Sequence, residues 1–250
     1  MKKFMALVLA FCLGVSLCAC GKTSTVEGKG YKTPEEALQA YAEALKTGDV
    51  DKILATYAVE SHVANFDMAR YIDHVGVYSA GSDYMLSPID TFTRESGVIQ
   101  RQYKIINQLS WMYLYVGFGE ELDSGVINVN QNGEYTSASR FLKDLEIDDW
   151  MDILAEMEIG DVLQPEDFVD DDLIPENTWD KAEDVLKKKE RYLGCDEIAC
   201  LGLETELDGE DYYLCPEFAC YGGKWYVLTQ AGTLAMLLGT PANTGGLVER

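Results

Sequence analysis

The chain has 250 residues with 20 basic and 43 acidic side chains, and its formal net charge at pH 7 is -23. Phosphate contacts require clusters of Lys and Arg, so this charge argues against a nucleic-acid partner. Apolar residues make up 47% of the chain, which excludes wholesale disorder. The length of the chain is enough for one large domain or two small ones.

The N-terminus has the pattern of a secretory signal. Lys2 and Lys3 precede an uncharged apolar stretch at 4–17, and small residues follow it. A positive start, a short apolar middle and a small-residue end are typical of a cleaved signal peptide. The stretch is too short for a transmembrane helix, which needs about 20 apolar residues. We therefore expect residues 1–19 to be removed on export.

The end of this signal, Leu17-Cys18-Ala19-Cys20, resembles a bacterial lipobox. The resemblance implies that Cys20 carries a diacylglycerol group and becomes the first residue of the mature chain. Two acyl chains hold a protein at a bilayer where one is marginal. We thus expect a domain anchored in the lipid bilayer through Cys20, on the extracytoplasmic face of the cell membrane. The alternative is an ordinary signal followed by an incidental cysteine.

Residues 20–32 are rich in Gly, Thr and Lys and lack apolar periodicity, so we expect a lipidated N-terminus and a flexible linker. A helical hairpin follows. Thr33 is its N-cap, Pro34 occupies the first helical position and Glu36 completes a capping box. Gly48 ends the first helix, and Asp49 caps a second short one.

Two more helices are predicted before the middle of the chain, near 66–78 and over 90–117. The end of the second, at 109–118, is apolar nearly all round. A helix that is apolar on every side is typically buried. We therefore expect 109–118 to be the most buried helix of the fold.

An acidic segment at about 137–192 has the composition of a helical insertion. Its first part predicts one or two helices. Residues 160–177 contain two prolines and predict a loop, and 178–193 predicts a helix whose acids come first and bases last.

The last third of the chain has strand-like residues and two turn signals, Asp208-Gly209 and Gly222-Gly223. Centred on the Gly-Gly turn, Cys220 faces Trp225 across a hairpin. We expect at least three antiparallel strands, near 196–206, 212–221 and 224–230. The fold class is therefore α+β, and residues 241–250 are expected to form a flexible tail.

Besides Cys20, four cysteines remain after processing, and one antiparallel register pairs Cys195 with Cys220 and Cys200 with Cys215. This register needs a four-residue loop at the first turn. Disulfides are permissible in an exported protein. Four buried free thiols are the alternative. A zinc site is disfavoured, because this spacing on flat strands points the thiols to opposite faces.

The sequence carries no recognisable catalytic motif. His62 and His74 have no partner at catalytic spacing, and a nucleophile elbow, a phosphate loop and a zinc-binding helix motif are all missing from the sequence. The acidic runs at 148–152 and 170–172 predict solvated faces rather than paired catalytic acids, and 167–172 lacks the spacing of a calcium loop. We assign no catalytic, cofactor-binding or metal-binding residue.

Aromatic residues on the long helix and the last strands form a candidate pocket lining: Trp111, Tyr113, Phe218 and Trp225. Such residues line many small-molecule sites. The alternative is that they belong to the hydrophobic core.

The stretches TPEEALQAYAEALKTGDVDKILATY and CYGGKWYVL resemble the opening and the closing hairpin of NTF2-like (SnoaL-like, cystatin-like cone) proteins. The resemblance implies one domain over 33–240, in which the helical hairpin and further helices pack on a curved antiparallel sheet around a pocket. Residues 60–192 do not match that pattern. The pocket Asp/His pairs of the family's enzymes have no counterpart here, so no catalytic residue carries over.

These observations predict a lipid-anchored, non-enzymatic module that binds a small molecule or a surface protein. A structural or assembly module that contacts partners through the acidic segment is the first alternative. A hydrolase or isomerase with an unrecognised pocket site is the second.

Overall fold

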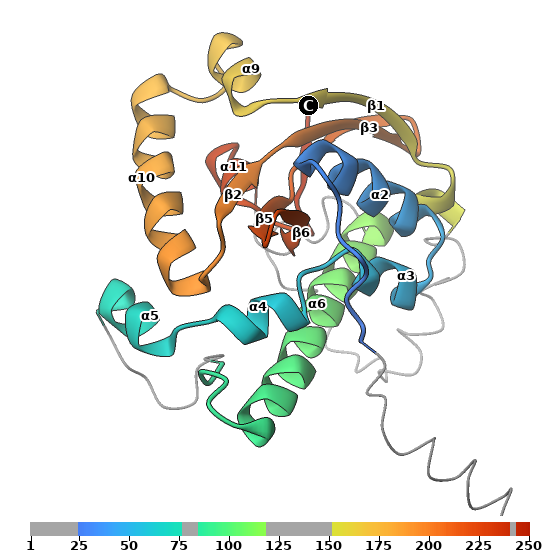
Figure 1. Ribbon diagram of the computed structural model, residues 1–250. Coiled ribbons are helices and arrows are strands. Elements are labelled where there is room, and N and C mark those ends of the chain that lie inside the picture. Colours follow the sequence, from blue (N-terminus) through green and yellow to red (C-terminus); the bar gives the residue numbers. More distant parts are fainter. Residues whose placement is uncertain (1–24, 77–84, 119–151, 241–243) are drawn as a thin grey trace, which may run out of the picture.

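The computed structural model describes residues 25–76, 85–118, 152–240 and 244–250 (Figure 1). Helices occupy most of its N-terminal half and antiparallel strands most of its C-terminal third, so the chain is an α+β protein. The signal, Cys20 and the first part of the acidic segment lie outside the described residues. None of the described helices is long and apolar enough to cross a membrane.

The helical hairpin forms as predicted, from α2 (Pro34–Lys46) and α3 (Val50–Ala55). Thr33 Oγ1 accepts the backbone N–H of Glu36 at 3.2 Å, and Glu36 Oε2 accepts that of Lys32 at 3.0 Å. The first bond satisfies a donor at the start of the helix that has no partner within it, and the second holds the residue just before the N-cap. The buried face of α2 packs on the strands of the C-terminal third.

Three helices follow: α4 (Glu60–Asn65), α5 (Met68–Val75) and α6 (Thr91–Phe118). The last two match the sequence prediction, whereas α4 was not expected. Leu109, Met112 and Tyr115 on α6 are buried, but Trp111 is 39% exposed. The prediction that 109–118 is the most buried helix is therefore wrong, because α6 buries only one side.

The strands form two antiparallel sheets. One has the order β2-β5-β6, with bounds Glu197–Cys200, Glu217–Tyr221 and Lys224–Thr229. The other has the order β1-β3-β4-β7, with bounds Glu158–Leu163, Gly202–Leu207, Glu210–Leu214 and Leu247–Glu249. Figure 1 shows β1 and β3 side by side as a long curved pair above α2.

Two of the predicted strands are each divided between these sheets. The chain leaves β2 for β3 at Leu201, and it leaves β4 for β5 at Cys215-Pro216. Pro216 has no N–H with which to continue a ladder, so a break there is expected on physical grounds. The Gly222-Gly223 hairpin forms as predicted, with Cys220 opposite Trp225.

The register predicted for the four cysteines is wrong. Glu197 lies opposite Cys220, and Cys200 lies opposite Glu217, which is a shift of two residues. Asp208 and Gly209 both have positive φ, so they form a two-residue turn instead of part of a four-residue loop. The four thiols are free in the structure.

The acidic segment is not wholly helical. Residues 160–177 were predicted to be a loop, but β1 pairs with β3, and α9 (Pro165–Asp170) follows β1 directly. None of the residues of β1 is buried, and backbone pairing with β3 holds the strand in place. The strand therefore lacks the periodic apolar pattern by which a sequence reveals a buried face. The helix predicted at 178–193 is confirmed as α10 (Glu176–Leu193).

The prediction of a flexible tail over 241–250 is also wrong, because β7 pairs with β4 and Leu247 and Val248 are buried. Gly245 and Gly246 both have positive φ and lie against the core. A Cβ on Gly246 would lie 2.0 Å from the carbonyl oxygen of Gln230, so only glycine allows this approach. Residues 241–243 lie outside the described residues.

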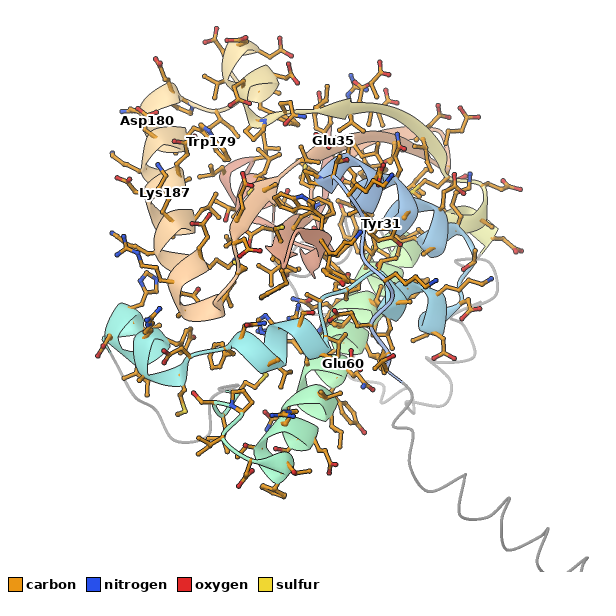
Figure 2. The ribbon with its side chains drawn as sticks, in the orientation of Figure 1. Tyr31, Glu35, Glu60, Trp179, Asp180 and Lys187 are labelled. Atoms are coloured by element: carbon orange, nitrogen blue, oxygen red, sulfur yellow. The ribbon has the colours of Figure 1, made fainter. Side chains whose placement is uncertain are left out.

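Part of the predicted linker is docked on the fold, and we call residues 26–31 the N-terminal strap. Glu60 accepts the backbone N–H groups of Val26 at 2.8 Å and Glu27 at 2.9 Å. Tyr31 forms a bridge with Trp225 of β6. Figure 2 shows Tyr31 and Glu60 along this path, and Trp179, Asp180 and Lys187 on α10 across the molecule. The expectation of a flexible linker is therefore wrong for the strap, whose polar backbone finds partners.

Candidate functional site

A cavity of about 830 Å³ lies among α4, α5, α6, α10 and β6. Small-molecule sites typically have volumes of about 300–1,000 Å³. Ile99 and Tyr103 of α6 line the cavity and are largely exposed, so this side opens to solvent. α6 packs on the core through Ile105, Leu109 and Met112, while Ile99 and Tyr103 of the same helix line the cavity.

Among the described lining residues, the charged side chains are Arg101, Lys104 and Lys189, all of them basic. The whole chain has 43 acidic residues and 20 basic ones, so a cavity lined by charged residues in these proportions would contain mostly carboxylates. Their absence from the described lining makes the cavity a positive region on a strongly negative protein.

Arg101 is the most deeply placed of these cations, with only 7% of its surface exposed. Its Nε donates to the carbonyl oxygen of Ala58 at 3.1 Å, and its Nη2 donates to that of Leu228. These bonds attach α6 to the chain before α4 and to β6, and they fix the orientation of the guanidinium. Burial lowers the pKa of Arg101, but an arginine remains charged in a protein.

Lys189 reaches the cavity from α10 and forms an ion pair with Glu217 of β5. Glu217 is completely buried and also accepts the backbone N–H of Thr233 at 3.2 Å and its hydroxyl at 2.8 Å. Burial lowers the pKa of Lys189, but the charge of Glu217, its hydrogen bond to Lys189 and smaller contributions from Tyr192 and Cys200 together raise the pKa above its usual value. Lys189 therefore stays positive in the cavity wall.

His62 is buried and lines the same cavity as these cations. Its Nδ1 is 3.4 Å from the hydroxyl of Tyr221, and its ring stacks on Phe66 at a centroid distance of 6.0 Å. Burial lowers the pKa of His62 well below its usual value, and the positive charges of Arg101 and Lys104 lower it further. The imidazole is thus neutral at pH 7.

We expect the free energy of unfolding to fall as the pH drops below about 6.5. The unfolded chain gains a proton on His62 near that pH, whereas the folded chain gains it only at a much lower pH. The slope from this group is at most about 1.4 kcal/mol per pH unit. Urea unfolding of the wild type at pH 7.0, 6.5, 6.0 and 5.5 measures it.

His62→Gln should flatten this slope, because it removes the group whose pKa differs between the folded and the unfolded chain. A wild-type protein with equal stability at pH 7.0 and 5.5 would contradict the assignment of His62 as a buried neutral group.

Aromatic side chains supply much of the remaining wall. Phe66 and Tyr71 have ring centroids 5.7 Å apart, and Tyr71 packs edge-on against Tyr192 at 5.1 Å. Tyr103 and Trp111 line the α6 side. The cavity therefore offers both flat apolar surface and positive charge.

Of the four aromatic residues predicted to line a pocket, only Trp111 does so. Phe218 is completely buried in the core, where it packs with α2 and α6 residues. Tyr113 and Trp225 are partly buried against that same core, and Trp225 also pairs with the strap. Phe218, Tyr113 and Trp225 therefore belong to the hydrophobic core or pack against it, as the alternative interpretation of the sequence predicts.

The sequence reasoning missed Arg101 and Lys189, although a signal for both exists. Arg101 precedes Ile105 and Leu109 at four-residue steps on the buried face of α6. Lys189 falls three residues after Leu186 on the buried face of α10. A cation on an apolar helix face needs a partner or a polar cavity, so this pattern marks candidates for a site.

Other candidate residues from the sequence do not come together. His74 packs against Tyr192 at 5.3 Å, outside the cavity. Within the described residues there is no cluster of three or more His, Cys, Asp or Glu side chains with metal-binding geometry. Asp148 and Asp149 lie outside those residues.

Fold and site together define an α+β protein with a solvent-accessible cavity lined by basic and aromatic side chains. The chain is similar, at 14% sequence identity and a TM-score of 0.42, to the crystal structure of a cystatin-like protein from Ruminococcus gnavus. That likeness covers 78% of this chain and 39% of the other. No protein-family model matches the chain, and no curated protein matches it.

Proposed function

We propose that the mature chain is a lipid-anchored binding protein on the extracytoplasmic face of the cell membrane, and that its cavity holds a small molecule. The observation that carries this proposal is the 830 Å³ cavity, whose wall combines aromatic side chains with a few convergent polar groups. That combination is characteristic of small-molecule sites.

Several details support a function in binding. Gln108 reaches the cavity from α6, and its Oε1 atom is buried without a hydrogen-bond partner among the described residues. A buried acceptor without a partner is costly, and a donor group on a ligand would satisfy it. The guanidinium of Arg101 is held rigidly by two carbonyl groups, which reduces the entropy lost when a ligand binds.

The anchoring part of the proposal rests on the lipobox resemblance at Cys20 and is supported by the strap. Glu60 holds the chain at Val26, so few residues separate a lipidated Cys20 from the folded domain. At 3.3–3.6 Å per residue, they span about 20 Å when fully extended. The folded domain would therefore remain close to the bilayer. The net charge of the whole chain is -23, and loss of Lys2 and Lys3 with the signal makes it more negative, which opposes contact with anionic headgroups.

Native mass spectrometry of the protein extracted from membranes tests both parts. We expect a mature chain that begins at Cys20 and carries a diacylglycerol group, together with a non-covalent small-molecule adduct. Cys20→Ala should move the protein to the soluble fraction, because the acyl chains that retain it are lost. Continued membrane association of that variant would contradict the anchor.

The cavity has its own matched pair of variants on α6. Asn107→Trp places a large ring in the cavity, since Asn107 lines it and is exposed. Ser110→Trp adds the same ring to an exposed position outside the cavity. The adduct should be lost only from the first variant. An adduct that is absent from the wild type, or equally abundant in both variants, would contradict binding in this cavity.

A further inference from the structure

We propose that the ligand of this cavity is a small organic anion with an apolar body, and that Arg101 binds its anionic group. This inference rests on the proposed function and names the class of ligand. It follows from the placement of charge in the cavity, from the hydrogen bonds of one buried guanidinium and from the apolar part of the wall.

Arg101 has the hydrogen-bonding capacity that such a ligand requires. A guanidinium has five N–H donors. The carbonyl oxygens of Ala58 and Leu228 accept one N–H donor each, so three N–H donors of Arg101 remain without an acceptor among the described residues. Both acceptors are neutral carbonyl groups, and no described carboxylate lies within 4.0 Å of Arg101 to form an ion pair.

A buried charge without a counter-ion is unfavourable, and pairing with an opposite charge offsets that penalty. Glu27 is a described acid whose charge reaches Arg101. Its carboxylate already accepts the backbone N–H groups of Val59 and Ser61 at 2.8 Å and the hydroxyl of Ser61. An anionic group in the cavity would give Arg101 the close partner that the described chain does not supply.

The neighbouring charges favour the same ligand. Lys104 and Lys189 line the cavity with Arg101, and the charges of all three act on His62. All three cations therefore line the same cavity as His62. Glu217 compensates Lys189 but lies behind it in the core, outside the described lining. Arg101 is thus the buried cation of the described lining without a carboxylate within 4.0 Å, and a neutral or cationic ligand would not supply one.

The rest of the wall indicates that the anion has an apolar body. Phe66, Tyr71, Tyr192 and Trp111 present aromatic surface, and Leu228 adds an aliphatic side chain. An inorganic ion would leave this surface in contact with water, whereas an apolar group would bury it at a gain of about 25 cal/mol per Å².

The test compares 2-naphthoate with 2-naphthamide, which has nearly the same shape and no charge, by isothermal titration calorimetry with the full-length protein. We expect 2-naphthoate to bind at least about tenfold more tightly, the size of effect that a charged hydrogen bond provides. Arg101→Gln should remove that preference. Lys104→Gln should weaken 2-naphthoate binding by about twofold to fivefold, because Lys104 is exposed and more strongly screened.

Arg94→Gln is the matched control, since Arg94 is an exposed cation on the same helix that does not line the cavity. Its 2-naphthoate affinity should equal that of the wild type. If Arg101→Gln unfolds, Lys104→Gln and the salt dependence of binding still measure the effect of charge. Equal affinity for the two probes would overturn the anion inference and leave the proposed function standing. Binding of neither probe would overturn both.

Discussion

Glu217→Gln is expected to lower the free energy of unfolding by about 3 kcal/mol, the low end of the effect of breaking a buried ion pair. Glu217 is completely buried, and donors surround its two carboxylate oxygens. Lys189 lies at one oxygen, and the backbone N–H and hydroxyl of Thr233 lie at the other. An amide of the same shape must turn its NH₂ group toward one of these donors, whichever way it is oriented.

Breaking this pair also affects the candidate site. The Glu217 carboxylate joins α10, β5 and the start of α11 (Thr233–Leu237). Its loss leaves Lys189 in the cavity wall without its partner. The side chain of Lys189 is 23% exposed, so part of the penalty is relieved by water. That partial exposure is why the expected effect lies at the low end.

Glu204→Gln is the matched control for this prediction. Glu204 pairs with Arg250 at 3.0 Å, but the two side chains are 28% and 37% exposed. A surface pair contributes less than about 1 kcal/mol. Urea unfolding of the two variants under identical conditions gives both values. A similar loss in both would show that the buried carboxylate has no special role.

Gly246→Ala is expected to destabilise the fold by about 3 kcal/mol and to release β7 from β4. Gly246 has a φ of +86°, and an added Cβ would lie 2.0 Å from the carbonyl oxygen of Gln230 and 2.8 Å from its carbon. The left-handed backbone costs an alanine about 1 kcal/mol. Overpacking of a well-packed position adds about 1–3 kcal/mol.

Gly209→Ala separates these two contributions. Gly209 has a similar φ of +82°, but no atom lies within 4 Å of the position of its Cβ. We expect a loss of only about 1 kcal/mol from its backbone conformation. Hydrogen exchange at Leu247 and Val248 provides a second measurement, since their amides should lose protection only in Gly246→Ala. Equal effects of both variants would contradict the close packing of this segment.

The candidate site shows where sequence reasoning reached its limit. Paired carboxylates, histidine motifs and aromatic clusters do not include Arg101 or Lys189, whose sequence signal is a cation on an apolar helix face. Only the packing of α4, α6 and α10 brings these cations and His62 around one cavity. Likewise, Phe218 and Trp111 are both apolar aromatic residues, and only the fold decides that one is core and the other faces the cavity.

The sequence by itself determined the elements whose signals are local. The Thr33 cap, the Gly48 corner, the extent of α6 and the Gly222-Gly223 hairpin all depend on residues within a few positions of one another. Tertiary structure alone decided the division of the strands between two sheets, the pairing of β1 and β7, and the gathering of cations in the cavity. These features arise from contacts between residues far apart in the chain, whose energies depend on which surfaces meet and leave no periodic pattern in either segment.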